Sequence, residues 1–188
     1  ASVSADSIAY SRVKVGKVMA HTVTVNLNDP NVRVSVALAK NGAGNSESFS
    51  SLVRRTAPAA AITGTFYDTR TFLPTGDIAL FGTLVHKGCV GSALCIDRNN
   101  RPSIVSLTAG RISDWSGCET VLCAGPVLVA RSKVAIALKH EGFRSSLHSP
   151  ARRTAVGITK SGKLLMVVIN RPVSLYTLAK KLLQLNCT

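Results

Sequence analysis

The chain has 188 residues, 46% of them hydrophobic and 17% charged, and its 23 Lys+Arg against 9 Asp+Glu give a formal net charge of +14. This length and composition predict a folded domain with a sizeable core and exclude a disordered chain. The longest apolar runs, residues 57–62 and 164–169, are as long as strands, whereas a membrane-spanning helix needs about 20 apolar residues. We therefore expect no membrane span.

The first predicted elements are strands. Alternating β-branched residues on either side of an Asn-Asp-Pro-Asn turn predict a hairpin or meander over residues 13–38. A Gly/Asn loop then leads to a predicted helix at residues 47–56, with Ser46 as its N-cap. Residues 57–62 are predicted to form an apolar strand that ends in a polar turn.

The rest of the chain alternates between short strands and Gly or Asn turns. Strands are predicted at residues 78–80, 84–86, 93–97 and 103–107, and a hairpin over residues 149–170. The closing helix is predicted from apolar residues at helical spacing, which are Leu175, Leu178, Ala179, Leu182 and Leu183, with Ser174 as its N-cap. We expect a single domain over residues 1–188, of the α+β class, in which a strand-rich mixed sheet packs against a few helices.

The positive charge is spread along the chain. Its adjacent basic pairs are Arg54-Arg55, Arg152-Arg153 and Lys180-Lys181, with no run of five or more. Such a charge attracts phosphate-bearing polymers, anionic glycans or membrane surfaces without selecting among them. Nucleic acid is the less favoured partner, because the chain has neither a basic tail nor an aromatic-rich RNA-binding signature.

Five cysteines bear on the compartment, and they are Cys89, Cys95, Cys118, Cys123 and Cys187. Their spacings do not match the close pairs of zinc sites, so we expect a secreted, periplasmic or lumenal protein whose signal peptide is already absent. Disulfides within neighbouring couples are sterically conceivable, but the sequence does not determine the pairing. The odd Cys187 predicts a free thiol or a partner beyond Thr188, and buried reduced cysteines in a cytosolic protein are the alternative.

Several common motifs are excluded. Residues 157–163 have the spacing of a phosphate-binding loop, but Leu164 stands where a hydroxyl would hold magnesium and a β run follows instead of a helix. No Gly-x-Ser-x-Gly elbow or His-Glu-x-x-His motif is present, so we predict no metal site and no cofactor. His148, within an Arg-rich loop, is a candidate proton donor or phosphate ligand, and an exposed histidine without a role is the alternative.

Two segments resemble the phosphodiester glycosidase family in order and spacing. The first is Ala59-Ala-Ala-Ile-Thr-Gly-Thr-Phe-Tyr-Asp68, followed by Leu73-Pro-Thr-Gly-Asp77, and the second runs from Gly125-Pro-Val-Leu to Ala151-Arg-Arg-Thr-Ala-Val-Gly157. Thr63 stands where the family has Asn, and Thr65 where it usually has Gly. With the hairpin and the last helix, the resemblance spans roughly residues 10 to 188.

The resemblance implies hydrolysis of a sugar-1-phosphodiester, such as one of N-acetylglucosamine, in a glycan, exopolysaccharide or glycoconjugate. It makes Arg153 the candidate that holds the departing phosphate, because a guanidinium fork fits two phosphate oxygens, and Asp68 the candidate carboxylate. The candidate substrate-binding residues are Thr63, Gly64, Asp77, Gly125, His148, Arg152 and Thr154. Alternatives remain for three of these: Arg153 paired with a carboxylate or backbone carbonyl, Asp68 as a turn residue, and Asp77 as a structural residue.

In this family an Asp-Gly-Gly-Gly-Ser run follows almost directly after such a helix, and here the sequence stops at Thr188. We therefore expect a complementary C-terminal polypeptide, either a second chain left by cleavage or residues removed from this one. Two other functions stay open. One is non-catalytic binding of an anionic polysaccharide or cell-envelope polymer through the +14 charge, and the other is non-specific nucleic-acid binding.

Overall fold

The computed structural model describes residues 7–108 and 113–188. Its strands are β1 (Ile8–Val15), β2 (Val18–Val25), β3 (Ile78–Leu80), β4 (Thr83–His86), β5 (Ala93–Asp97), β6 (Pro102–Val105), β7 (Cys118–Cys123), β8 (Val129–Ala130), β9 (Lys133–Val134), β10 (Ala151–Ile158) and β11 (Leu164–Val173). The helices are α1 (Phe49–Thr56), α2 (Leu175–Gln184) and the short 3-10 helix η1 (Ser145–His148).

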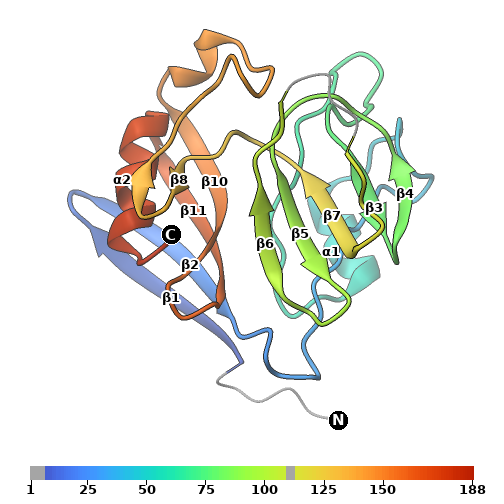
Figure 1. The fold of residues 1–188 in the computed structure, drawn as a ribbon, viewed down its shortest axis with the longest axis horizontal. Helices are drawn as coiled ribbons and strands as arrows, with labels where there is room; N and C mark the ends of the chain where they lie inside the picture. Colours follow the sequence, from blue (N-terminus) through green and yellow to red (C-terminus); the bar gives the residue numbers. More distant parts are fainter. Residues whose placement is uncertain (1–6, 109–112) are drawn as a thin grey trace.

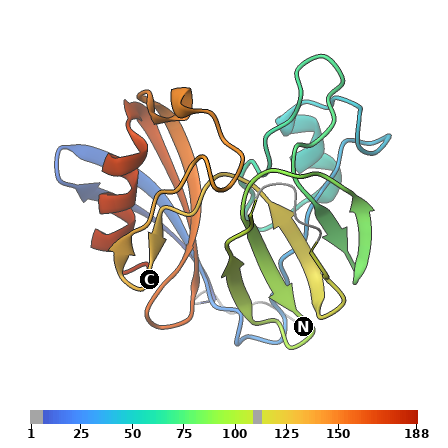
Figure 2. The same ribbon diagram turned by 45° about the horizontal axis from the view of Figure 1, so that its top comes forward.

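The strands form two main sheets that lie side by side (Figures 1 and 2). The four-stranded sheet has the order β1-β2-β11-β10 and the five-stranded sheet the order β4-β3-β7-β5-β6, while β8 and β9 pair as a small ribbon. All these pairings are antiparallel. Strands dominate and two α-helices are present, so the predicted α+β class is confirmed.

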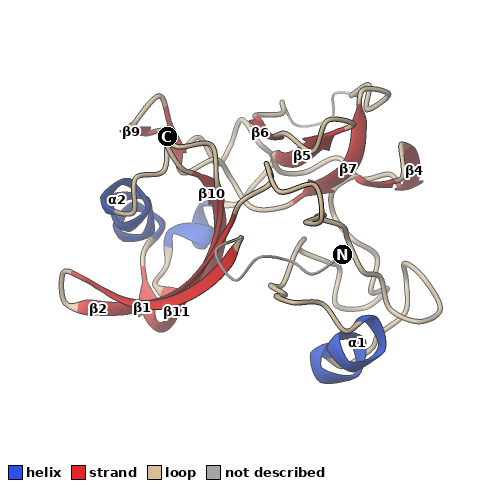
Figure 3. Ribbon diagram, turned by 90° about the horizontal axis from the view of Figure 1, so that it is seen from below, coloured by secondary structure: helices blue, strands red, loops and turns tan. Residues whose placement is uncertain are grey.

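The closing helix α2 lies along one face of the four-stranded sheet, whereas α1 lies apart from it, beyond the five-stranded sheet (Figure 3). The apolar face predicted from spacing is the buried face, since Leu178 is 2% exposed and Ala179 is fully buried against residues such as Ile169. Burying a leucine side chain contributes about 1.5–3 kcal/mol. Ser174 caps the helix as predicted, because its hydroxyl accepts a hydrogen bond from the Thr177 amide at 3.1 Å.

The other face of the four-stranded sheet joins the two sheets into one body. Val25 and Leu164, on β2 and β11, form a buried cluster with Ile96 on β5 and Val32 in the connecting segment. Side chains of both sheets thus pack in one cluster.

Two predicted strands are absent. Residues 32–38 and 57–62 are in neither a strand nor a helix. Within the described part of the chain, the backbone groups of residues 61–65 make no backbone hydrogen bond to another segment. The alternating pattern of residues 32–38 suits a strand, whereas residues 57–62 consist of four alanines, a proline and an isoleucine, and alanine and proline are depleted in strands. A strand also requires a neighbouring strand to complete its hydrogen bonds.

Two element boundaries also differ from prediction. Helix α1 begins two residues later than expected, with Ser48 rather than Ser46 as the N-cap, because the Ser48 hydroxyl accepts from the Ser51 amide at 3.2 Å. The strand that the family resemblance implies at residues 125–128 does not form, because the Val127 amide bonds to the Glu141 carboxyl group instead of to a strand, and β8 follows at Val129–Ala130. Helix α1 buries none of its residues.

All five cysteines are described, and all five are free thiols in this structure. Cys95 on β5 and Cys118 on β7 lie together in the core of the five-stranded sheet, beside Cys123. Burial, with a smaller contribution from Cys118, raises the pKa of Cys95 to about 12. Neither helix within the described ranges is long and apolar enough to cross a membrane.

Candidate functional site

The two segments singled out in the sequence meet in space, although they lie far apart along the chain. The hydroxyl oxygens of Thr63 and Thr154, 91 positions apart, are 3.2 Å from each other. Gly125 adjoins Phe66, since a Cβ built on this glycine would lie 3.6 Å from the phenylalanine ring. At Gly64 a Cβ would lie 2.8 Å from a methyl carbon of Leu122, so a larger residue would require the Leu122 side chain to shift.

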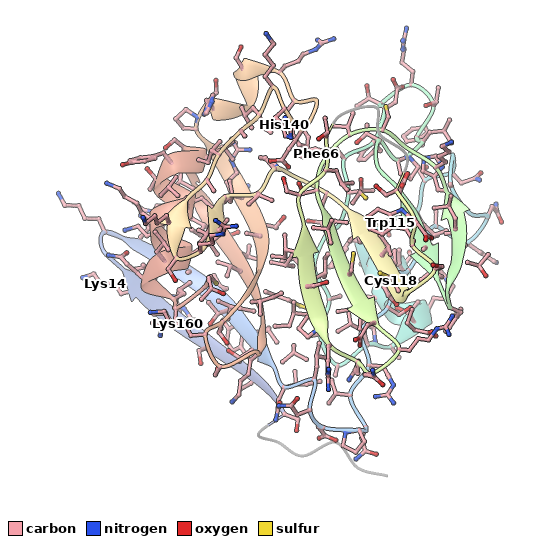
Figure 4. All side chains as sticks on the ribbon, in the orientation of Figure 1. Lys14, Phe66, Trp115, Cys118, His140 and Lys160 are labelled. Carbon is pink, nitrogen blue, oxygen red and sulfur yellow. The ribbon has the colours of Figure 1, made fainter. Side chains whose placement is uncertain are left out.

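An open groove lies beside this meeting point. It has a volume of about 380 Å³ and is lined by Ala137, Leu138, Lys139, His140, Phe143, Ser145 and His148. Phe143 packs edge-on against Phe66, with ring centroids 5.7 Å apart. Figure 4 shows His140 and Phe66 near each other, where the two halves of the molecule meet. Three basic side chains in one groove suit an anionic ligand.

His148, which the sequence made a candidate ligand, lies on this groove at the last position of η1. Its neighbour across the groove, His140, was not predicted, and its Nε2 lies 3.1 Å from the Thr108 hydroxyl. Among the described residues, no group of three or more His, Cys, Asp or Glu side chains is placed to hold a metal ion.

Arg153 is half-buried near the start of β10, and its guanidinium holds η1 and the following turn against the four-stranded sheet. Its Nη2 donates to the carbonyl oxygens of Leu147 at 2.8 Å and Ser149 at 2.6 Å, and its Nε donates to that of Val173 at 3.5 Å. Burial lowers the pKa of this guanidinium, which nevertheless stays charged. The side chain is thus paired with backbone carbonyls, one of the alternatives raised by the sequence. Its Nη1 makes no hydrogen bond to the described residues.

Arg152 is exposed beside Arg153, where the register of β10 and β11 shifts. The shift between Ala151 and Arg153 turns the two adjacent arginines into different environments. Only Arg153 contacts the turn that carries the groove.

Asp68 is exposed and shapes its own loop. Its Oδ1 accepts hydrogen bonds from the amides of Arg70 at 2.8 Å and Thr71 at 3.0 Å. These bonds, led by the one from Arg70, hold the pKa of the carboxyl group below its usual value. The Asp68 carboxyl group is therefore charged at neutral pH. No contact joins it to Arg153 in the described part of the chain.

Asp77 uses both carboxylate oxygens inside the protein. Oδ1 accepts from the Gly88 amide at 2.8 Å, and Oδ2 accepts from the indole nitrogen of Trp115 at 2.7 Å. The adjoining cavity has a volume of about 10 Å³, which is about the space of one water molecule. Asp77 thus ties the Gly88 loop to Trp115, and its predicted substrate contact stays a prediction.

Glu141 is a buried acid next to the groove that the sequence did not single out. It is 1% exposed, hydrogen-bonds the hydroxyl of Ser92, and accepts from the Val127 amide at 3.1 Å with each carboxylate oxygen. Burial raises its pKa. The carboxyl group fixes residues 137–148, which line the groove and which we call the groove segment, to Ser92, directly before β5. It belongs to no motif, and the one available signal was its position as a lone acid in a basic stretch.

Comparison with known proteins supports the resemblance. The sequence profile of the phosphodiester glycosidase family matches residues 56–188, and the chain therefore belongs to this family. No curated protein matches the chain.

Two solved structures share the fold. A hypothetical protein from Synechocystis superposes with a TM-score of 0.79 at 14% identity, over 96% of this chain and 54% of that one. The zebrafish N-acetylglucosamine-1-phosphodiester alpha-N-acetylglucosaminidase catalytic domain, auto-inhibited by its pro-peptide, superposes with a TM-score of 0.68 at 20% identity, over 96% of this chain and 67% of that one. The chain thus spans about half the length of the Synechocystis protein.

Proposed function

We propose that this chain provides most of a hydrolase that cleaves a sugar-1-phosphodiester in a glycan or glycoconjugate. The observation that carries the proposal is the juxtaposition of Thr63 with Thr154 beside a groove lined by Lys139, His140 and His148. Membership of the phosphodiester glycosidase family supports the same reaction. A sugar phosphodiester presents an anion and a polar ring together, and this groove offers basic groups next to hydroxyl groups.

In the proposed reaction a water oxygen attacks the anomeric carbon, and the bond from that carbon to the phosphate oxygen breaks. The phosphate monoester leaves with the electron pair, and the proton of the attacking water passes to a carboxylate. We assign the carboxylate role to Asp68. Because the leaving phosphate is already stable as an anion, binding its charge matters more than protonating it.

Phosphate binding is assigned to the free Nη1 edge of Arg153 together with His148. The three carbonyl contacts leave that edge unbonded among the described residues, and they also fix the orientation of the guanidinium. A preoriented charge stabilises a developing anion without reorganisation. Gly64, Gly125 and Thr154 would then line the sugar side, while Arg152 and Asp77 are assigned to the periphery.

We further propose that a complementary C-terminal polypeptide completes this site. Residues 61–65 support this idea, since their backbone groups lack a strand partner within the described chain. An added strand would satisfy them. In keeping with the family, we propose a secreted, periplasmic or lumenal location.

The test is release of free sugar from an N-acetylglucosamine-1-phosphodiester by purified protein, after its intact mass and any second polypeptide have been determined. Arg153→Ala is expected to lower turnover at least about a hundredfold, as removal of a transition-state donor does. Arg54→Ala, a change at an exposed position of α1, is the matched control and should leave turnover unchanged. Full activity in a correctly folded Arg153→Ala protein would overturn the assignment.

Non-catalytic binding of an anionic polysaccharide is the second candidate function. The observation that favours it is that residues 7–25 and 126–188, in the half with the four-stranded sheet, hold fourteen of the 23 lysines and arginines but a single acid. Salt-sensitive glycan binding without sugar release, by protein complete in both polypeptides, would select it over hydrolysis.

A further inference from the structure

The positive charge is concentrated in one half of the molecule. Residues 7–25 and 126–188, which form the four-stranded sheet and the elements packed on it, contain fourteen lysines and arginines and a single acid. That acid, Glu141, is 1% exposed and does not neutralise the surface. Residues 26–125 hold nine basic and seven acidic residues and are almost balanced. Nearly the whole net charge of +14 therefore belongs to one half.

Five lysines of this half lie on helix α2 or in the segments next to it, and we call this surface the α2 face. It consists of Lys17, Lys133, Lys160, Lys180 and Lys181. The ammonium group of Lys181 lies over the turn before Lys17, 2.6 Å from where a Cβ on Gly16 would be. The Lys160 amide bonds to the carbonyl of Asn186 at 2.9 Å, just beyond α2, and β9 with Lys133 packs against the helix. Figure 4 shows Lys160 and the further basic residue Lys14 on this side of the molecule.

The lysines of the α2 face are not paired with carboxylates. Within the described ranges, the single ion pair joins Arg55 to Glu47 and lies in the other half. Lys181 donates to the Gln184 side-chain oxygen at 3.3 Å, and Lys180 lies 4.6 Å from the centre of the Tyr176 ring. These neutral partners leave the charges available. Like charges repel one another over a Debye length of about 8 Å at physiological salt, so an external polyanion would relieve that repulsion.

The arrangement suits a polymer better than a small anion. Three of the lysines come from two turns and a strand beside the helix, and two come from the helix itself, which has ten residues and is roughly 15 Å long. Four different chain segments therefore contribute the charges. A chain with repeated, separated negative charges would contact several of them together.

We propose that the α2 face is a binding surface for a polyanionic glycan, separate from the groove. Lysines predominate on this face, although the exposed Arg131 lies in the turn just before Lys133, and a lysine acts as a separate point charge rather than as a planar fork. Lys180 lies over one side of the exposed Tyr176 ring and so competes with a base for stacking on that side. This surface does not depend on the proposed hydrolysis. In an enzyme it would keep the groove close to a polymeric substrate.

The test uses binding to phosphomannan, a phosphate-bearing polysaccharide, measured by titration over a series of salt concentrations. The double variant Lys17→Glu/Lys180→Glu changes two exposed residues of the α2 face. Its matched control, Arg54→Glu/Lys87→Glu, makes the same change in net charge at exposed positions of the balanced half. Thermal unfolding of all three proteins confirms that they are folded.

The α2-face variant is expected to bind at least about tenfold more weakly at low salt, and with a shallower salt dependence, while the control changes less than about twofold. Equal weakening in both variants would show that only net charge matters and would overturn the proposal. So would failure of the unmodified protein to bind phosphomannan, or tighter binding of duplex DNA than of phosphomannan at the same salt concentration.

Discussion

Replacing Gly91 tests how closely the groove segment packs against the five-stranded sheet. Gly91 has a φ of +95°, and a Cβ on it would lie 2.0 Å from the Ala124 carbonyl oxygen and 3.3 Å from the Phe143 ring. Its amide also donates to the carbonyl of Glu141 at 3.0 Å. Alanine at this position would push apart the contacts that hold the groove segment in place.

Gly42 provides a control that separates backbone strain from crowding, since its φ is +86° and a Cβ there would meet nothing within 4 Å. Positive φ should destabilise both alanine variants by about 1–3 kcal/mol. Crowding should add about 1–3 kcal/mol at Gly91 alone, which corresponds to a further fall in Tm of roughly 2–12 °C for a domain of this size.

Urea and thermal unfolding, followed by the fluorescence of the chain's one tryptophan, Trp115, measure the difference between the two alanine variants. A Gly91→Ala protein no less stable than Gly42→Ala would refute the close approach, and with it the argument that this glycine positions the groove.

Three further predictions concern charged and thiol groups. Arg153→Ala should lower the free energy of unfolding by about 2–3 kcal/mol, because backbone carbonyls bonded to a charged donor lose their partner. The exposed neighbour gives the control, since Arg152→Ala should change the free energy of unfolding by less than about 0.5 kcal/mol. Equal effects of the two substitutions in urea unfolding would contradict the hydrogen bonds from Arg153 to the carbonyls. Iodoacetamide at neutral pH should modify the exposed Cys89 in the native protein and spare the buried Cys95, whose pKa is raised to about 12. Peptide mass mapping would locate the modified cysteines. Early labelling of Cys95 would argue against its burial. Burial raises the pKa of Glu141 in the folded state. The stability of the protein relative to the Glu141→Gln variant should therefore fall as the pH rises from the unfolded-state pKa of a glutamate, about 4.3, through the folded-state pKa of Glu141. Tm measurements that show the opposite trend would contradict burial as the cause.

Local patterns in the sequence predicted the elements that depend mainly on neighbouring residues. The spacing of Leu175, Leu178 and Leu182 was sufficient for α2, and Ser174 for its cap. The hairpin over residues 149–170 was predicted for the same reason, since it joins two apolar runs through a Gly turn. The family, too, could be predicted from short ordered segments, and the match over residues 56–188 confirms it.

Local patterns failed where the structure depends on a distant partner. Residues 57–62 are an apolar run of strand length, but they have no strand beside them in the described structure, and their alanines and proline are residue types depleted in strands. Likewise, no sequence rule could place Ser48 ahead of Ser46 as the N-cap of α1, because both serines precede the same helix.

The sequence by itself determined the fold class, the family, the last helix and the excess of positive charge, because each follows from composition or from spacing within a short window. Only the tertiary structure decided that Thr63 meets Thr154, that Arg153 is bonded to backbone carbonyls, and that the lone acid Glu141 is buried. It also decided that the charge gathers around α2. These features join residues far apart in the chain, and their contacts depend on how the sheets and loops pack rather than on any local preference.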